Sequence, residues 1–349
     1  MHWLLAKLLT EKFKNRNFAF LANTGVGDML AYELAKISRG FIIDSMTFKY
    51  RRKITITEQG GNNLSDYQVR IDLDATNFDF SHFLNEGKDL RFTDASKNLL
   101  PYWVEKMDIT AQEATIWVRV PSIPANSSTD IYMYYGNPTV ASASDGSATF
   151  EFFDDFEDLE GWTDYQSAWS HVTTEGHDNN AAYGDKEVDD LNMFQYNDAM
   201  PSDPLLYEAR MKAEYLGYSD AESWDRFGFF ILSGANDYTP SINLDISRGY
   251  GLRFAVTDAG GSRTTDEFNL AAVSTGVWYI LGIFVDGANV KAFLDFEEKY
   301  SGSDSNANFS PRYVGFNCYD SSGWVDWVRV RKYTEPEPSV SIGAEETAS

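Results

Sequence analysis

The stretch WYILGIFVDGANVKAFLDFEEKYSG, residues 278–302, holds two alternating runs on either side of Asp286-Gly287. An Asp-Gly pair between two such runs is a strong short-range signal for a β-hairpin with a two-residue turn. We therefore predict a hairpin here, in which Leu294 and Phe296 face the protein interior and the neighbouring acids face solvent.

The rest of residues 150–349 carries further strand-like segments and no long helical pattern. These segments are LLYEARMKAEYL, RFGFFILSG, YGLRFAVTD, RYVGFNCYD and WVDWVRVRKY. Aromatic residues make up 15% of the chain, and aromatic side chains favour half-buried strands. The sequence predicts that residues 150–349 form a jelly-roll-like β-sandwich of antiparallel sheets.

Residues 46–138 alternate in the same way, in YRRKITITE, YQVRIDLD, ATIWVRVPSI and TDIYMYYGN. Between these runs, EQGGNNLSD and IPANSSTD supply residues typical of turns. We predict a second antiparallel β-sandwich here. The small and polar residues that follow predict a linker at 139–149, so the chain is mainly β with two sandwich domains.

Residues 1–45 differ from the rest because their apolar residues follow a helical period. The first stripe consists of Leu4, Leu5, Leu8, Leu9 and Phe13, and the second of Leu30, Leu34 and Ile37. We predict a short helical segment that docks on a larger assembly or anchors the chain. Lys7 interrupts the first apolar run, so it makes a poor secretory signal.

The net charge of -24 comes from 53 acidic and 29 basic residues. Nucleic-acid binding needs a basic face, so we predict no nucleic-acid partner, and we expect no docking on an anionic membrane. No run reaches the roughly 18 apolar residues of a membrane span. The single Cys318 rules out an intrachain disulfide and a cysteine-based zinc site.

Two resemblances to known families rest on ordered sequence blocks. YRRKITI, YQVRIDL, FDFSHF, DLRFTD, LPYWVEKMD, ATIWVRVPSI and IYMYYGNP resemble domain of unknown function 2341, a module of archaeal and bacterial surface proteins. FFDDFEDLEGW, GVWYILGIFVDGANVKAFLD and VDWVRVRKYTEPEPSVSIG resemble a laminin-G-like, concanavalin A-like lectin/glucanase domain. The second resemblance implies a sandwich that binds or cleaves glycans.

Glucanases of this fold carry a Glu-x-Asp-x-x-Glu motif on one strand. In FLDFEEKY, Asp295 and Glu298 have the matching spacing, but Phe293 stands at the place of the first Glu. Glycoside cleavage needs two suitably placed carboxylates. We therefore predict no catalytic residues and a protein that is not an enzyme.

The acids of FFDDFEDLEGW, residues 152–162, suggest a metal instead. The first and last strands of such a sandwich lie side by side, so Asp155, Glu157 and Asp326 are predicted to meet and hold calcium, which prefers oxygen ligands. The alternative is that the aromatic side chains of this stretch pack inward and the carboxylates are only solvated.

Sandwich lectins bind sugars with aromatic rings and with Asn or Asp side chains. The candidate ligand-binding residues at strand ends and turns are Trp224, Asn236, Tyr238, Asn317, Tyr319 and Trp324. The alternative for each is an ordinary rim or core residue.

Together these features predict a non-enzymatic, extracellularly exposed recognition or adhesion protein. A virion appendage (a spike, turret or tail fibre) that binds host-surface glycans would reconcile surface-protein modules with a poor secretory signal. We expect it to be a homo-oligomer docked through residues 1–45. The alternatives are a cellular surface adhesin of an archaeon or bacterium, and a glucanase-like hydrolase.

Overall fold

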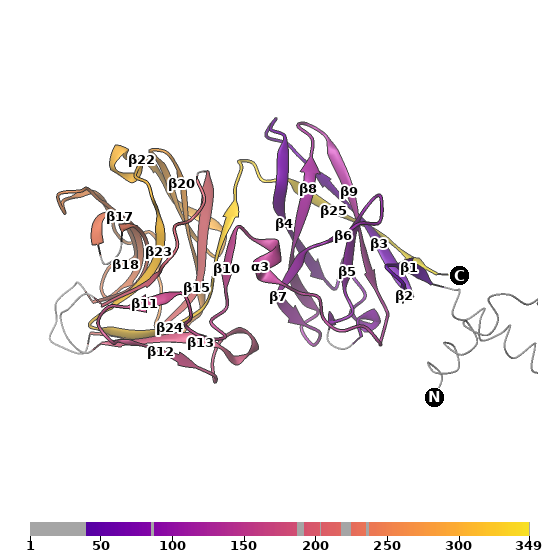
Figure 1. Ribbon diagram of the computed structural model, residues 1–349, viewed down its shortest axis with the longest axis horizontal. Coiled ribbons are helices and arrows are strands. Elements are labelled where there is room, and N and C mark those ends of the chain that lie inside the picture. The colour runs from indigo at the N-terminus through magenta and orange to yellow at the C-terminus, as the bar shows by residue number, and fades with distance from the viewer. Residues whose placement is uncertain are drawn as a thin grey trace, which may run out of the picture.

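The computed structural model describes residues 40–84, 87–186, 192–202, 204–217, 225–234 and 237–348. These residues form two antiparallel β-sandwiches side by side (Figure 1), which confirms the predicted fold class. The predicted helices lie in residues 1–39, outside the described residues. Residues 41–48, which begin within the predicted helical segment, form a small hairpin of β1 (Phe41–Ile43) and β2 (Met46–Phe48). No helix among the described residues is long and apolar enough to cross a bilayer.

The first sandwich packs a five-stranded sheet, in the order β25-β3-β9-β5-β6, against a three-stranded sheet, in the order β4-β8-β7. Alternate side chains of both sheets point into a shared apolar core. The strands are β3 (Tyr50–Thr57), β4 (Leu64–Asp74), β5 (Arg91–Asp94), β6 (Leu99–Leu100), β7 (Tyr102–Asp108), β8 (Glu113–Ile123), β9 (Ser128–Tyr135) and β25 (Ser339–Thr347).

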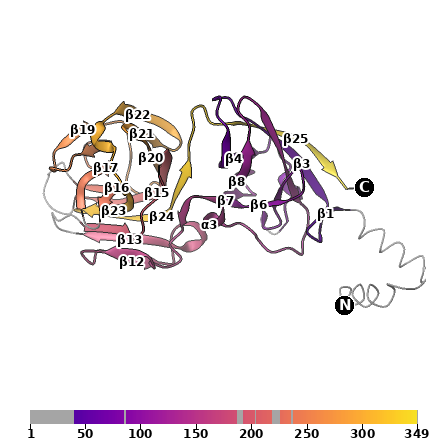
Figure 2. The same ribbon diagram turned by 45° about the horizontal axis from the view of Figure 1, so that its top comes forward.

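The last strand, β25, follows the second sandwich in sequence but belongs to the first. It pairs with β3 from Ser339 opposite Thr57 to Thr347 opposite Tyr50. Figures 1 and 2 show the yellow end of the chain crossing back to the first sandwich. The predicted bounds place residues 339–347 in the second sandwich, and the pairing of β25 with β3 shows that this assignment is wrong. The second sandwich is an insertion between β9 and β25 of the first.

The second sandwich has two larger sheets around one core. The back sheet has the order β12-β13-β24-β15-β20-β21-β22, with β10 beside β24, and the front sheet has the order β11-β14-β23-β16-β17-β18-β19. The back-sheet strands are β10 (Phe152–Asp154), β12 (Trp169–Val172), β13 (Ala181–Lys186), β15 (Leu205–Leu216), β20 (Tyr279–Asp286), β21 (Asn289–Leu294), β22 (Glu297–Ser303) and β24 (Ser321–Lys332). The front-sheet strands are β11 (Trp162–Asp164), β14 (Asn192–Tyr196), β16 (Arg226–Gly234), β17 (Asp237–Ser247), β18 (Gly251–Thr257), β19 (Arg263–Glu267) and β23 (Tyr313–Tyr319).

Short helical turns complete the description. They are η2 (Phe80–His82), α3 (Gly146–Thr149), η4 (His177–Asn179) and η5 (Ser305–Ala307). The α3 turn lies in the predicted linker, where the Asp145 side chain accepts a hydrogen bond from Ala148 N and caps the turn. The linker is thus folded between the two sandwiches.

The hairpin predicted at Asp286-Gly287 is confirmed. In β20 and β21, Asp286 lies opposite Asn289, and Gly287 has φ of 58°. A second tight turn at Asp295-Phe296 follows, with both residues in the left-handed region. The prediction that Phe296 faces the core of its own sandwich is wrong, because this turn directs its ring against the guanidinium of Arg70 in the first sandwich, 3.9 Å from the ring centre.

An aromatic cluster joins the two sandwiches. Trp103 and Trp117 of the first sandwich meet Phe150 and Trp327, and all four are buried. Trp103 lies edge-on to Trp327, with ring centres 5.5 Å apart. The outer face of the back sheet is therefore covered by the first sandwich where these rings meet.

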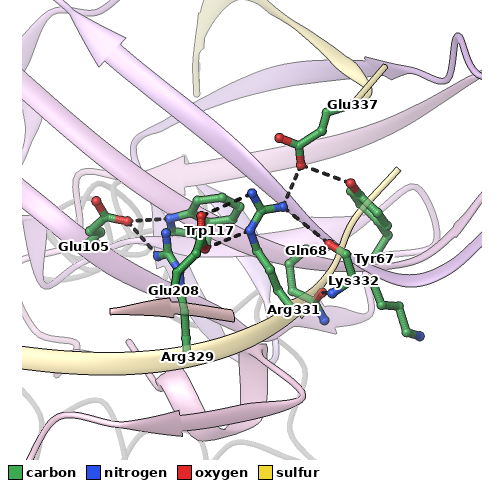
Figure 3. A network of polar contacts seen from close by, with 9 residues as sticks. All are labelled: Tyr67, Gln68, Glu105, Trp117, Glu208, Arg329, Arg331, Lys332 and Glu337. Carbon is green, nitrogen blue, oxygen red and sulfur yellow. Dashed lines mark hydrogen bonds and ion pairs between the residues drawn. The ribbon is translucent and has the colours of Figure 1, made fainter. Parts of the chain in front are cut away.

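A buried polar network crosses the same interface (Figure 3). Arg329 donates to Glu208 in its own sandwich and to Glu105 in the first, each at 2.7 Å. Trp117 Nε1 also donates to Glu105, at 2.7 Å. Arg331 donates to Glu208 at 2.9 Å, so one carboxylate lies between two guanidinium groups.

The network has a defined pH dependence. Burial alone would raise the pKa of Glu208, but the charges of Arg329 and Arg331 outweigh it and lower the pKa to about 2. A lowered folded-state pKa adds stability above the unfolded value of 4.5, and that stability is lost as the pH falls from there toward 2. The contribution at neutral pH is about 3 kcal/mol.

We therefore expect the free energy of unfolding to fall more steeply between pH 5 and pH 2.5 in the wild type than in Glu208→Gln, which cannot titrate at this position. Urea unfolding at several pH values measures both slopes. Burial raises the pKa values of Asp245 and Asp326, so these two groups make the free energy of unfolding rise as the pH falls. Both proteins contain them, so their contribution cancels when the two slopes are compared. Equal slopes would contradict the assignment.

Candidate functional site

Side chains of the front sheet alternate between the core and an outward face. In β17 the core-facing side chains are Ile242, Leu244 and Ile246, and the side chains that alternate with them are Ser241, Asn243, Asp245 and Ser247. Along β17 the outward face of the front sheet is therefore polar.

Strand register places the outward residues in rows across the front sheet. One row runs from Asn317 in β23 through Gly228 in β16 and Asp245 in β17 to Arg253 in β18. The next row contains Gly315, Phe230, Asn243, Ala255 and Asp266. Larger neighbours fill the space above Gly228 and Gly315 in these rows.

A groove of about 520 Å³ lies on this face. This volume is within the range of small-molecule binding sites. Its lining residues are Arg226, Phe230, Thr239, Ser241, Asn243, Arg253, Thr257, Gly261, Arg263 and Asp266. The groove is polar and contains three arginines.

Charged groups of the groove bridge one another. The guanidinium of Arg253 lies 3.1 Å from Asp245 Oδ2 and 2.7 Å from Asp266 Oδ1. Asn243 Nδ2 donates to Asp245 Oδ2 at 2.6 Å. Burial raises the pKa of Asp245, and the nearby charges of Arg226 and Arg253 offset this only in part.

Among the residues that the structure describes, two buried groups beside the groove find no hydrogen-bond partner. Asn317 is 0% exposed, and neither its Oδ1 nor its Nδ2 has a partner there; the same holds for Oδ1 of the fully buried Asp245. A buried polar atom without a partner costs about 1 to 3 kcal/mol. The structure holds these groups unsatisfied around Gly228, which points to a position built for a ligand.

Gly228 is needed for this arrangement. A Cβ at this position would contact Asp245 Oδ1 and would lie 2.7 Å from Asn317 Oδ1 and 2.6 Å from the Phe230 ring. All three contacts are closer than Cβ atoms tolerate. The glycine therefore allows an amide and a carboxylate to flank one another across β16.

The structure brings two of the predicted ligand-binding residues to this face. Asn317 and Tyr319 are alternate residues of β23, and the Arg226 guanidinium lies 5.0 Å from the centre of the Tyr319 ring. Trp224 and Asn236 lie outside the described residues, and the Tyr238 side chain is not described.

Trp324 lies on the other sheet. It belongs to β24 of the back sheet, where its ring lies 5.1 Å from the Tyr183 ring and 4.2 Å from Lys212 Nζ. The structure therefore does not bring Trp324 together with Asn317. The sequence could not separate them because sheet membership depends on long-range pairing.

The predicted calcium ligands do not assemble. As expected, β10 lies beside β24, with Asp154 opposite Val328. Asp326, however, is buried and accepts hydrogen bonds from Arg210 and from His177 N, whereas Glu157 is exposed. Among the residues that the structure describes, no group of three potential ligands could hold a metal ion.

The stretch 152–162 fits its alternative interpretation in its aromatic residues, whereas Asp154 is not simply solvated. Phe156 and Trp162 are buried in the core. Asp154 accepts hydrogen bonds from Phe156 N and Trp162 Nε1, both at 2.8 Å, and burial raises its pKa. This carboxylate fixes the fold of its own loop.

Sequence reasoning missed Gly228, Asn243, Asp245, Arg253 and Asp266. The available signal was SINLDIS, residues 241–247, in which a polar residue occupies every second position. Such alternation is equally typical of a strand face open to water. Only the register shows that Asp245 shares a row with Asn317 and that Asn243 lies in the next row.

A family profile described as domain of unknown function (DUF2341) matches residues 86–172, about a quarter of the chain. The match confirms the resemblance to that family over the later blocks, from DLRFTD onward, and extends through β12. The surface-protein setting and the laminin-G-like subtype remain predictions. No curated protein matches the chain.

Several solved structures are similar to this chain. One is the carbohydrate-binding module CBM66 from Bacillus subtilis, at 14% identity and a TM-score of 0.38 over 49% of this chain and 96% of that one. Another is a glycoside hydrolase family 16 endo-glucanase from Bacteroides ovatus, at 12% identity and a TM-score of 0.38 over 51% of this chain and 99% of that one. A third is a β-1,3-glucanase from Mycobacterium marinum, at 14% identity and a TM-score of 0.36 over 52% of this chain and 98% of that one.

Two of these three structures are glycoside hydrolases, which contradicts our prediction that the chain is not an enzyme. That prediction rested on Phe293 and its neighbours, which lie in β21 and β22 of the back sheet. A missing motif there does not bear on the groove, which lies on the front sheet. The prediction is withdrawn, and at these identities no activity is transferred to this chain.

Proposed function

We propose that the second sandwich binds a glycan in the groove of the front sheet. The observation that carries the proposal is the pair of unsatisfied groups beside the groove, the Asn317 amide and Asp245 Oδ1. A sugar hydroxyl both donates and accepts hydrogen bonds. It can donate to the carboxylate and accept from the amide, which satisfies both groups at once.

Other features of the face suit a sugar ring. Phe230, which is 3% exposed, borders the groove, and the half-buried Tyr319 lies at the end of β23, so aromatic side chains lie beside the polar groups. A ring with an apolar face and polar edges matches this mixture.

Asn317→Ala is expected to weaken glycan binding about tenfold or more, because two hydrogen bonds of about 1 kcal/mol each are lost. Its melting temperature should stay unchanged or rise, because the replaced amide has no partner in the free protein. The measurement is a glycan panel with the full chain, followed by titration calorimetry and thermal unfolding of both proteins.

Two further variants make this test specific. Gly228→Ala should weaken the same binding by pushing Asp245 and Asn317 apart. Asn62→Ala, an exposed residue of the first sandwich, is the matched control and should change nothing. If Asn317→Ala lowers the melting temperature and leaves binding intact, the amide serves the fold and the proposal fails.

The same incubations are analysed for released reducing ends and repeated with a chelator. Release that Asp245→Asn abolishes would identify the groove as an active site of a glycoside hydrolase. Loss of binding with the chelator would restore the calcium prediction, although we expect binding to persist because the described residues of the groove lining include one carboxylate, Asp266.

We further propose that the chain is displayed at an exterior surface, as a virion spike, turret or tail fibre that binds host glycans. The acidic composition and the sequence resemblance of residues 46–138 support this proposal, and the apolar pattern of residues 1–45 supports docking of a homo-oligomer on a larger assembly. Recovery with purified particles tests it. Recovery only with cell envelopes would favour a cellular adhesin.

A further inference from the structure

Three asparagines of this chain lie in the motif that accepts N-linked glycans. The motif is an asparagine followed two positions later by serine or threonine, with any residue except proline between them. Asn63, Asn126 and Asn308 begin such triplets, in NLS, NSS and NFS. Asn137 begins the triplet NPT, which the proline excludes. Because the motif is short, the place of each asparagine in the fold decides whether it can act as an acceptor.

The fold separates the permitted triplets from the excluded one. Asn63, Asn126 and Asn308 are exposed and lie outside the strands, and the serine that completes each triplet is exposed as well. Asn137 is 5% exposed, and its Oδ1 accepts hydrogen bonds from Thr139 N at 2.9 Å and Thr139 Oγ1 at 2.8 Å. The asparagine of the excluded triplet therefore stabilises its own turn, whereas the other three are open to a modifying enzyme.

Two of the acceptors meet at one tip of the first sandwich. Asn63 directly precedes β4, and Asn126 lies in the turn between β8 and β9. Asn63 Oδ1 accepts a hydrogen bond from Ala125 N at 3.0 Å. Glu58 also joins the two loops, because its carboxylate accepts from Gly61 N at 3.0 Å and from Asn126 N at 2.7 Å. The two asparagines are therefore held close together on this tip.

The amide nitrogens at this tip are available for reaction. N-linked glycans are attached at Nδ2, and neither Asn63 Nδ2 nor Asn126 Nδ2 donates a hydrogen bond to any residue that the structure describes. The hydrogen bond from Ala125 N uses Asn63 Oδ1, which a modified amide keeps. A glycan can therefore be present on either residue without loss of a hydrogen bond of the folded chain.

We propose that Asn63, Asn126 and Asn308 carry N-linked glycans, two of them on this tip. The donor is a glycan linked through a phosphate or diphosphate to a lipid. Nδ2 of the asparagine forms a bond to the anomeric carbon of the glycan, and the bond from that carbon to the phosphate oxygen breaks. The lipid phosphate leaves with the bonding electrons, and Nδ2 loses one proton to solvent.

This inference goes beyond the proposed groove, because it concerns glycans attached to the chain itself. N-linked glycans are attached to surface loops of secreted proteins, in keeping with the exterior display proposed above. The modification requires export of the chain. Its detection therefore also tests the prediction that the first apolar run, which Lys7 interrupts, is a poor secretory signal.

The test uses the full chain, recovered from the particles or cell envelopes that carry it. Peptide mass spectrometry compares the mass of each peptide with the mass of its sequence. We expect the peptides that contain Asn63, Asn126 or Asn308 to carry additional carbohydrate mass. The peptide that contains Asn137 should have the mass of its sequence.

Substitutions of the triplet serines, made in the same host, show whether the motif is responsible. Ser128→Ala should abolish the additional mass on Asn126, although the asparagine itself is unchanged. Ser127→Ala leaves the triplet intact and is the matched control, with the additional mass retained. Both serines are exposed, so neither substitution should change the melting temperature.

A second pair of substitutions treats the other acceptor of the tip in the same way. Ser65→Ala should abolish the additional mass on Asn63. Asn62→Gln changes the exposed neighbour, which begins no triplet, and should leave that mass in place.

The state of the tip decides the proposal. Additional mass on Asn63 or Asn126 that depends on the corresponding serine supports it. Sequence masses at both residues overturn it, whatever Asn308 carries, and so does additional mass that persists in Ser65→Ala and Ser128→Ala. None of these results depends on the groove of the second sandwich, so the proposed function and this inference fail separately.

Discussion

Arg329→Ala is expected to lower the free energy of unfolding by about 3 to 5 kcal/mol, the usual cost of removing one partner from a buried ion pair. Arg329 is 0% exposed and lies between Glu208 and Glu105, at 2.7 Å from each. Its removal leaves the partly buried Glu105 beside Trp117 without a positive partner at this distance. The two sandwiches share this residue, so the loss affects both.

Aromatic rings add to the effect. The Arg329 guanidinium lies 4.2 Å from the centre of the Trp117 ring and 4.5 Å from that of Trp327. A desolvated guanidinium over an aromatic ring gains up to about 2 kcal/mol. Alanine would also leave a cavity among these rings, which cannot close without moving one sandwich relative to the other.

Urea unfolding followed by tryptophan fluorescence measures the effect, since the network includes Trp117. Arg329→Lys keeps the charge but loses the hydrogen bonds to both Glu208 and Glu105. Its free energy of unfolding should lie between those of Arg329→Ala and the wild type. Lys106→Ala removes a positive charge from an exposed pair with Glu113 and should cost less than about 1 kcal/mol. Equal effects of Arg329→Ala and Lys106→Ala would show that the interface does not hold the sandwiches together.

The interface also shows where sequence reasoning ends. The alternation of WVRVRKY, residues 327–333, predicts a strand and places Arg329 and Arg331 on one face. An arginine opposite a core face is normally solvated, so nothing local predicts burial. Burial results from the second sandwich docking on Trp103 and Trp117, more than 200 residues earlier in the chain.

The same limit applies to the groove. The hairpin at Asp286-Gly287 could be predicted because turn and strands are adjacent in sequence. The groove combines β16, β17, β18 and β19, and the rows that join it to β23 depend on register across five strands. Asn317 was selected as one candidate among six, but its lack of hydrogen-bond partners is a property of the folded sheet alone. Asp245 stood out in no way from the many other acids of the chain.

The pairing of β25 with β3, which are far apart in sequence, predicts that truncation of the chain before β25 lowers its stability. A chain ending at Pro338 is expected to lose about 4 kcal/mol of stability. Val340 and Ile342 pack on the core of the first sandwich, and each half-buried aliphatic side chain contributes about 1 kcal/mol. The hydrogen bonds between β25 and β3 contribute about 0.5 to 1.5 kcal/mol each, and several are lost.

Side-chain contacts of β25 reinforce the pairing. Tyr135 donates to Glu345 Oε2 at 2.8 Å, and His82 Nδ1 lies at the same distance from that oxygen. Without the strand, the hydroxyl of buried Tyr135 loses its acceptor. The edge of β3 then exposes its backbone groups to solvent and to other chains, which favours aggregation.

Thermal unfolding and light scattering of the truncated chain measure both consequences. Glu346→Gln is the matched control, because it removes only the exposed ion pair with Arg51 and should cost less than about 1 kcal/mol. A peptide of residues 339–348 added in excess should bind β3 and restore part of the lost stability. An unchanged melting temperature after truncation would show that β25 adds nothing to the first sandwich. The expected loss also means that a fragment of residues 150–349 separates a strand from its partner, so binding experiments require the full chain.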